Sequence, residues 1–135
     1  MKSLSVALII DDKFPSSSGV SRSVQTQIEE LTCLGHKVTL LAPHASLEAP
    51  KQAKTIPIKS FRLPGLPIHT RILCATNRAA KIISQQHRFD LIHSQTDTGA
   101  LLLAAKIARQ QHIPHIHTFH TNIAGSHTVP IHIFC

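Results

Sequence analysis

Tryptophan and tyrosine are absent from the sequence, and apart from histidine its aromatic side chains are five phenylalanines. Proteins that hold single-stranded nucleic acid without sequence preference stack the bases on aromatic side chains. So few aromatic side chains argue against that class of protein. We also find no nucleic-acid-binding motif and therefore expect no nucleic-acid partner.

Cysteine and long apolar runs are also scarce. The three cysteines, Cys33, Cys74 and Cys135, are odd in number and far apart, which indicates a reducing cytoplasm rather than a disulfide framework. The apolar run after Lys2 meets Asp11 without a small-residue cleavage site, which argues against a signal peptide. No segment approaches the roughly 18 apolar residues of a spanning helix, so any membrane contact is expected to be peripheral.

Acidic residues are few as well. Seven Asp and Glu stand against 14 Lys and Arg, a formal net charge of +7 when the 11 histidines are counted as neutral. A balance this basic favours anionic partners: a lipid surface, a nucleotide or, on charge alone, a nucleic acid. The 135 residues are enough for one domain with a real core.

The most informative stretch lies near the amino terminus. An apolar run at Val6–Ile10 predicts a strand, a polar loop follows, and an apolar pattern of helical period begins at Val20. A loop at the carboxyl end of a parallel strand is where ligands bind, and the helix behind it attracts anions. The alternative is that Asp11, Ser16 and Ser18 only turn the chain and cap the helix.

The rest of the chain alternates between strand and helix patterns. Gly35 is placed to end the first helix. Pro57 cannot donate to a central ladder, so the strand that contains it is expected at an edge of the sheet. We predict strands over Lys37–Ala42, Thr55–Phe61, Phe89–His93 and His115–Phe119, and helices over His69–Gln86 and Ala100–Gln111. This order predicts an α/β fold: a Rossmann-like, doubly wound, mostly parallel sheet with helices on both faces. Three polar loops, 11–19, 94–98 and 120–122, are then expected to line one cleft.

The predicted helix over His69–Gln86 is amphipathic. At 100° per residue Arg71, Arg78 and Lys81 fall beside one another and form a basic stripe. Such a stripe is either a solvated face or a contact with anionic lipid headgroups. Both interpretations remain open from the sequence.

Histidines cluster in the last predicted strand. His115, His117 and His120 form an H-x-H-x-x-H pattern, and the first two share a face of a strand, as zinc ligands do. The third lies past the strand end, and no carboxylate or cysteine stands nearby in the sequence to complete a set. We therefore predict no metal site.

Four segments in this order carry a resemblance to a known family. They are Asp11 with P-S-S-S-G-V from Pro15, L-G-H-K-V from Leu34, F-D-L-I-H-S-Q-T-D from Phe89, and I-P-H-I-H-T-F-H-T-N from Ile113. The stretch Leu4–Asn122 resembles the amino-terminal half of retaining family 4 glycosyltransferases of the GT-B fold. The pattern is most similar to bacterial enzymes that transfer glucose to diacylglycerol and to mannosyltransferases that act on phosphatidylinositol.

The resemblance implies roles for particular residues. It places the backbone of Ser18, Gly19 and Val20 near the diphosphate of a sugar nucleotide, where a residue without Cβ makes physical sense. It makes His120 the catalytic histidine that faces the reacting sugar and acceptor; without the family, that histidine simply closes a strand end. The other substrate-binding residues that it implies are Thr96, Asp97, Thr121 and Asn122.

The resemblance also implies partners. The donor is a nucleotide-sugar, UDP- or GDP-hexose, bound as a co-substrate, and neither a cofactor nor a metal is implied. The acceptor is a lipid or a sugar, and the membrane contact falls to Arg71, Arg78 and Lys81. The protein is then expected in the cytoplasm, peripheral on the inner face of the membrane.

Domain organisation follows from the same comparison. Residues 1–122 form the acceptor-side domain, and 123–135 are an atypical tail that we interpret as the product of a truncation or frameshift. Enzymes of the family carry a second domain with most nucleotide contacts, so we expect this fragment to have no turnover alone. The alternative is a non-catalytic Rossmann-like module that binds an anionic ligand or a lipid surface.

Overall fold

The computed structural model describes residues 2–14, 18–43, 52–120 and 131–134. The strands are β1 (Ser5–Ile9), β2 (Lys37–Pro43), β3 (Lys54–Ile58), β4 (Ser60–Phe61), β5 (Ile72–Leu73), β6 (Leu91–Ser94), β7 (His115–Thr118) and β8 (Ile131–Phe134). The helices are α1 (Gly19–Cys33), α2 (Asn77–Gln86) and α3 (Gly99–Gln111). Among these described residues, no helix is both long and apolar enough to cross a membrane.

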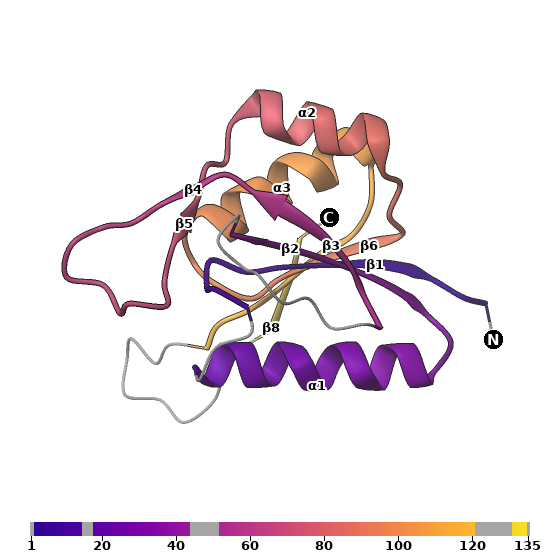
Figure 1. Ribbon diagram of the computed structural model, residues 1–135. Coiled ribbons are helices and arrows are strands. Elements are labelled where there is room, and N and C mark those ends of the chain that lie inside the picture. Colours follow the sequence, from indigo (N-terminus) through magenta and orange to yellow (C-terminus); the bar gives the residue numbers. More distant parts are fainter. Residues whose placement is uncertain (1, 15–17, 44–51, 121–130, 135) are drawn as a thin grey trace.

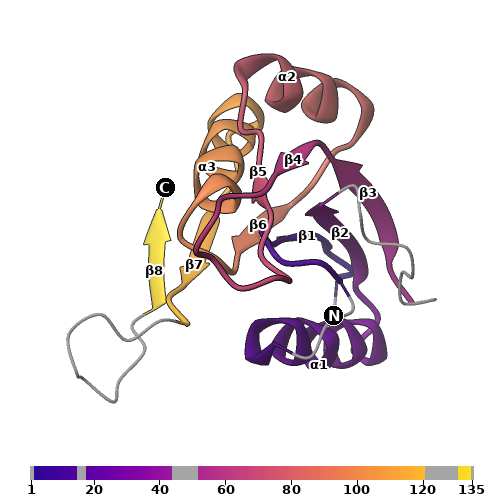
Figure 2. The same ribbon diagram turned by 60° about the vertical axis from the view of Figure 1, so that its left-hand side comes forward.

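The main sheet confirms the predicted fold class. Its strand order is β3-β2-β1-β6-β7-β8, and every neighbouring pair is parallel except β7 with β8, which is antiparallel. Figure 2 shows β8 and β3 at opposite edges of the sheet. The short strands β4 and β5 pair with each other as a separate antiparallel sheet.

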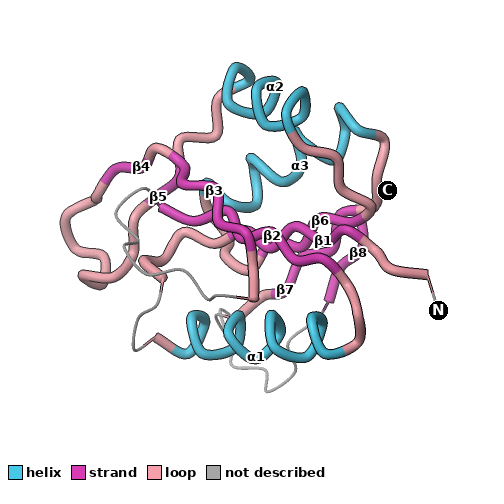
Figure 3. Tube along the Cα trace, turned by 45° about the vertical axis from the view of Figure 1, so that its right-hand side comes forward, coloured by secondary structure: helices cyan, strands magenta, loops and turns pink. Residues whose placement is uncertain are grey.

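Helices cover both faces of the sheet. α1 lies on one face, and α2 and α3 lie on the other (Figures 1 and 3). Successive side chains of β1 point to opposite faces, so each face receives half of this apolar strand. Leu8 packs with Val24 and Ile28 of α1, whereas Ile9 belongs to the cluster that includes Leu103 of α3. The sheet is therefore buried from both sides, as a Rossmann-like fold requires.

The first helix ends where the sequence predicts. Gly35 has a φ of 90°, a conformation that side chains other than glycine rarely adopt. Its N–H donates to the carbonyl of Thr32, and the His36 N–H donates to that of Leu31. These bonds close the last turn of α1 and direct the chain into β2.

The helix predicted over His69–Gln86 is wrong in its first half. The chain from 69 to 76 contains β5 and loop, and α2 begins at Asn77 after Thr76, whose side chain accepts from the Ala79 N–H. The N–H groups of Arg71 and Leu73 donate to the backbone oxygen and carboxylate of Asp11, respectively. These tertiary hydrogen bonds outweigh the helical apolar period of the segment.

The basic stripe is corrected with it. Arg71 lies outside the helix, and its guanidinium donates to the hydroxyl and carbonyl oxygens of Ser60 in β4. Arg78 and Lys81 are exposed on α2. The three cations therefore do not form one helical face. The predicted strand Thr55–Phe61 likewise divides, into the edge strand β3 and the separate β4.

Candidate functional site

The loops that follow β1, β6 and β7 lie at one edge of the sheet. These three strands are parallel neighbours, so their carboxyl ends meet. In Figure 1 the end of β1, the end of β7 and the start of α1 all lie toward the left of the molecule. Hydrogen bonds between side chains of these loops connect them directly.

Asp11 is the centre of this edge and is 1% exposed. Its Oδ1 accepts from the backbone N–H groups of Leu73 and Ala100 at 2.8 and 3.1 Å. Its Oδ2 accepts from the hydroxyls of Thr96 and Thr98, both at 2.6 Å, and again from the Ala100 N–H. One buried carboxylate therefore joins β5, the 95–98 loop and the start of α3 to the end of β1.

Asp12 forms a second and more open junction. Its Oδ2 accepts from the Ser18 hydroxyl at 2.9 Å, and its Oδ1 accepts from the Thr70 hydroxyl at 3.1 Å. The Nε2 of His69 lies 3.9 Å from Oδ2. Ser18 is the N-cap of α1, because its oxygen also accepts from the Ser21 N–H. Asp12 thus reaches the start of α1 through the Ser18 hydroxyl.

Gly19 is the first residue of α1 and is exposed. A Cβ built on it meets no atom of the described residues within 4 Å. Packing among the described residues therefore does not explain a glycine at this position. Val20 follows it as a partly buried residue packed against the α1-side core, so its backbone, not its side chain, borders the edge.

His120 is held by a pair of glutamines. Gln95 is fully buried and exchanges two amide hydrogen bonds with Gln27 of α1, at 3.1 and 3.0 Å. The Nε2 of His120 lies 3.0 Å from the Gln95 Oε1. Because an amide oxygen only accepts, His120 donates from Nε2 and keeps Nδ1 as an acceptor when the ring is neutral.

The surroundings of His120 favour the neutral ring. Burial lowers the pKa of His120 below its usual value, and His117 lowers it further, while Asp97 and Asp12 oppose this effect. The charges of Asp97 and Asp12 thus act on the His120 ring, but burial remains the largest influence on its pKa. Its ring can accept a hydrogen bond from a hydroxyl group at neutral pH.

A chain of hydrogen bonds leads from Asp97 into the buried sheet. The Nε2 of His117, whose side chain is fully buried, lies 2.7 Å from the Asp97 Oδ1. The Nδ1 of His117 lies 2.7 Å from the Ser94 hydroxyl, which is also 2.8 Å from the Nε2 of His115. Both nitrogens of His117 therefore have partners, and the ring orients a carboxylate that is 29% exposed.

His93 of β6 and His115 of β7 are neutral near pH 7. Burial, together with nearby histidines, lowers the pKa values of His93 and His115 to about 4. His93 bonds the Thr118 hydroxyl at 2.7 Å. Within the described residues no group of three or more His, Cys, Asp or Glu side chains is arranged to hold a metal ion. The histidines of this cluster bond Ser94, Thr118, Gln95 and Asp97 instead.

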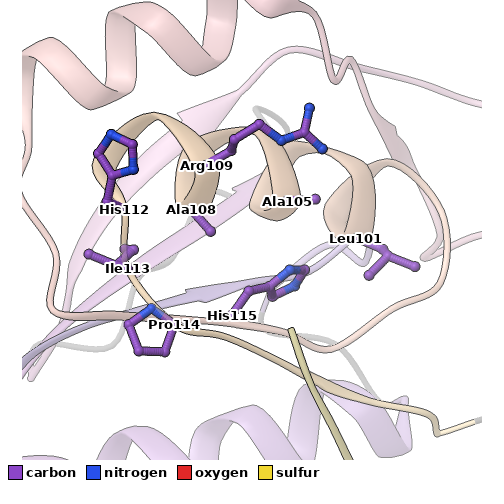
Figure 4. A pocket seen from close by; sticks show the side chains of 8 residues that line it. All are labelled: Leu101, Ala105, Ala108, Arg109, His112, Ile113, Pro114 and His115. Atoms are coloured by element: carbon purple, nitrogen blue, oxygen red, sulfur yellow. The ribbon is translucent and has the colours of Figure 1, made fainter. Parts of the chain in front are cut away.

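A large cavity lies elsewhere. It has a volume of about 810 Å³ and runs along α3 beside the amino end of β7 (Figure 4). Its lining residues are Leu101, Ala105, Ala108, Arg109, His112, Ile113, Pro114 and His115. His115 connects this cavity with the loop edge, because it lines the cavity and its Nε2 bonds Ser94 at the end of β6.

The structure brings together many of the residues that the sequence singles out. Ser18, Thr96, Asp97 and His120 each make a hydrogen bond at the loop edge, although Thr96 turns inward to Asp11. Thr121 and Asn122 lie outside the described residues. The Arg71 backbone N–H donates to the Asp11 carbonyl, but its guanidinium bonds Ser60 instead. Among the described residues, the side chains of Arg78 and Lys81 make no hydrogen bond to this edge.

Sequence reasoning assigned no substrate-binding or catalytic role to four residues of this edge. They are Gln27, Gln95, Gly99 and His117, with the central role of Asp11 in addition. The signal for Gln95 and Asp11 was present, since each is a polar residue at the end of a buried strand. Gln27 and Gly99 carry no local signal, because their partners are 68 and 26 residues away in the sequence.

Known proteins are similar to this chain in sequence. A family model described as Glycosyltransferase Family 4 matches residues 17–133. The chain is 32% identical over 120 residues to alpha-monoglucosyldiacylglycerol synthase of Streptococcus pneumoniae (strain ATCC BAA-255 / R6). That alignment covers 86% of this chain and 26% of the relative, so the chain spans about a quarter of the relative's length. The chain therefore belongs to glycosyltransferase family 4, and its Rossmann-like sheet is that of the amino-terminal half of a GT-B enzyme.

Proposed function

We propose that this chain is the acceptor-side half of a retaining glycosyltransferase that transfers a hexosyl group from a nucleotide-sugar to a membrane lipid. The name of the relative, a monoglucosyldiacylglycerol synthase, supports a glycolipid as the product. The donor is UDP- or GDP-hexose as co-substrate, with no cofactor. A second domain supplies most contacts to the nucleotide, so the chain alone has no turnover.

The observation that carries this proposal is the way His120 is presented. The fully buried Gln95, paired with the partly buried Gln27 of α1, fixes its Nε2, and its lowered pKa favours the neutral ring. The Nδ1 of such a ring can accept a hydrogen bond from a sugar or acceptor hydroxyl and hold it against the reacting carbon. His120 is the residue to which we assign the catalytic role.

The two sides of the edge have different tasks in this proposal. The backbone at Ser18, Gly19 and Val20 receives the diphosphate, because the start of α1 carries partial positive charge and Gly19 leaves room. The Asp97 carboxylate, oriented by His117, accepts a hydrogen bond from the acceptor. Thr96 positions that loop through Asp11. We assign Thr121 and Asn122 to substrate binding in the same segment.

Stabilising the leaving diphosphate and holding the acceptor supply most of the catalysis in such a transfer. Preorganised N–H donors act on charge as it develops, and they need no rearrangement during the reaction. A lipid acceptor places the reaction at a membrane. We therefore propose a cytoplasmic protein that binds peripherally to the inner face, with the exposed Arg78 and Lys81 of α2 attracted to anionic lipid.

The test supplies the second domain in trans. We expect the mixture to transfer labelled hexose from a nucleotide-sugar to diacylglycerol, and the chain alone to show no transfer. His120→Ala in the mixture should abolish transfer. The matched control is His87→Ala, because His87 lies at the end of α2 and stacks on Phe89, away from the loop edge. Full activity of the His120→Ala mixture would remove His120 from the mechanism.

A further inference from the structure

The segment that joins β4 to β5 exposes an unusual amount of apolar surface. Half of the eight large hydrophobic side chains exposed among the described residues fall within residues 61–68, which we call the 61–68 loop. They are Phe61 at 44%, Leu63 at 42%, Leu66 at 38% and Ile68 at 71% exposed. In Figure 1 this segment extends away from the sheet and helices.

The base of the 61–68 loop is firmly attached. Phe61 pairs with Ile72 between the antiparallel strands, and the Thr70 hydroxyl donates to Asp12. The His69 carbonyl accepts from the Lys13 N–H at 2.7 Å. The apolar side chains are thus presented from a fixed base, beside the loop edge that contains the candidate site.

The tip of the 61–68 loop is a tight turn. Gly65 has a φ of 90°, and the Leu66 N–H lies 3.4 Å from the Leu63 carbonyl. Pro64 and Pro67 have no N–H to leave unpaired in an apolar environment. A turn of this kind can enter an apolar phase with few unsatisfied backbone donors.

The stretch of sequence that contains the 61–68 loop carries charge of one sign, and the carboxylate that bonds the base of the loop, Asp12, is buried. Between Glu48 and Asp90 the sequence contains no acidic residue. The same stretch contains eight basic residues, Lys51, Lys54, Lys59, Arg62, Arg71, Arg78, Lys81 and Arg88. Lys59 and Arg62 are exposed and flank Phe61. Exposed apolar side chains with cations beside them match an anionic bilayer, whose headgroups attract the cations and whose acyl chains accept the apolar groups.

We propose that the 61–68 loop inserts Leu63, Leu66 and Ile68 into an anionic lipid bilayer, with Lys59 and Arg62 at the headgroups. This inference rests on the proposed function, since a lipid acceptor is the reason to bring the loop edge to a membrane. It places the principal membrane contact at the 61–68 loop rather than at Arg78 and Lys81 of α2. A protein partner fits less well, because a stable protein interface takes about 20–30 residues a side.

The first test measures binding of the purified chain to vesicles by co-flotation. We expect binding to vesicles of phosphatidylglycerol and phosphatidylcholine at low salt, and much weaker binding to phosphatidylcholine alone. The double variant Leu66→Ser/Ile68→Ser should lower the affinity at least ten-fold. The matched control is Leu102→Ser on α3, which is 53% exposed and should bind as the wild type does.

Ile82→Ser tests the rival surface on α2, where Ile82 is 42% exposed. If this substitution abolishes vesicle binding and the 61–68 loop variant leaves it intact, the proposal is overturned. Absence of wild-type binding to the anionic vesicles overturns it as well.

The second test places a reporter in the 61–68 loop. Because the chain has no tryptophan, Ile68→Trp introduces a single fluorophore. We expect its emission to shift to the blue on addition of anionic vesicles and to be quenched by brominated acyl chains. Leu102→Trp should show neither effect. Equal spectra for Ile68→Trp with and without vesicles overturn insertion even if the chain binds.

Both tests omit the nucleotide-sugar and the second domain. Vesicle insertion without transfer in the reconstituted mixture would count against the proposed function alone. Transfer without insertion by the 61–68 loop would count against this inference alone.

Discussion

Two helices of this protein begin at the same edge of the sheet, and each begins with a glycine. α1 starts at Gly19 after the β1 loop, and α3 starts at Gly99 after the β6 loop. Each helix start carries partial positive charge and unpaired N–H groups, so either one can bind an anion. The two helix starts have different surroundings in the structure.

The start of α3 is filled by the protein itself. Asp11 accepts from the Ala100 N–H with both carboxylate oxygens, and the N-cap Thr98 donates its hydroxyl to the same carboxylate. Gly99 lies against the chain, since a Cβ there would come within 2.2 Å of the Leu73 carbonyl oxygen. The anion that this helix attracts is a side chain, and the glycine is required by packing.

Among the described residues, nothing covers the start of α1 in the same way. Ser18 caps one N–H, and Gly19 is exposed with nothing among the described residues within 4 Å of an added Cβ. The comparison teaches that a helix N-terminus becomes a ligand site only if the fold leaves it uncovered. The same sequence feature, a polar loop followed by glycine, serves stability in one helix and is available for binding in the other.

The largest expected effect is the removal of the carboxylate that distinguishes α3. Asp11→Ala leaves two buried N–H groups and two threonine hydroxyls without their acceptor, so we expect the free energy of unfolding to fall by about 3–5 kcal/mol. Urea denaturation measures it. The control is Asp90→Ala, whose carboxylate accepts from the Ser5 N–H at the exposed opposite edge. Equal losses for both variants would contradict the special position of Asp11.

The same substitution in the two glycines gives the next largest effect. Gly99→Ala should lower the free energy of unfolding by about 3 kcal/mol, because the new methyl group meets backbone atoms that cannot rotate away. Gly19→Ala should leave the free energy of unfolding unchanged or raise it by about a few tenths of a kcal/mol, since alanine is the better helix former. Thermal and urea unfolding of both variants measure the difference. Similar stabilities would show that the two helix starts are equivalent.

Much of the fold follows from local sequence signals. The strands β1, β2, β6 and β7 and the helices α1 and α3 agree with the apolar periods to within one or two residues. Parallel order and helices on both faces follow from the alternation of these elements. The meeting of the loops at one edge follows in turn from the parallel order.

What the sequence did not predict depends on distant partners. The segment 69–76 has a helical apolar period, yet Asp11 draws the N–H groups of Arg71 and Leu73 into other hydrogen bonds. The antiparallel β8 was not predicted either, because it depends on pairing with β7. In the site, the position of Asp11 after a strand indicated a residue that turns the chain. Its role as the link between β5, the 95–98 loop and α3 is visible only in the tertiary structure. A residue's identity shows that it is polar, but not which segments it joins.

A smaller effect is the pH dependence of stability, which arises from histidines on the α3 side of the comparison. The histidine network borders the loop that leads into α3. Because the folded pKa of His93 is about 4, the unfolded chain binds its proton more tightly. Stability is therefore complete above pH 6.5 and falls as the pH drops toward 4, by about 1 kcal/mol for His93 at pH 5.5. Urea midpoints between pH 7.5 and 5 measure the slope.

His93→Gln is the variant that identifies the source of this slope. Glutamine can still bond the Thr118 hydroxyl but has no proton to gain, so its pH profile should be flatter than that of the wild type. His115 shifts in the same direction and keeps part of the slope in the variant. Parallel profiles for the two proteins would assign the acid sensitivity to other groups.

The smallest expected effect concerns the cap of α1. Ser18→Ala removes the acceptor of the Ser21 N–H and one donor to Asp12, so we expect a loss of about 1 kcal/mol in urea denaturation. Thr76→Ala removes the corresponding cap of α2 and should cost about the same. If the loss at Ser18 approached that of Asp11→Ala, the start of α1 would be a structural junction like the start of α3. A loss no larger than that of Thr76→Ala keeps it an ordinary cap, with the backbone at Gly19 available to an anion.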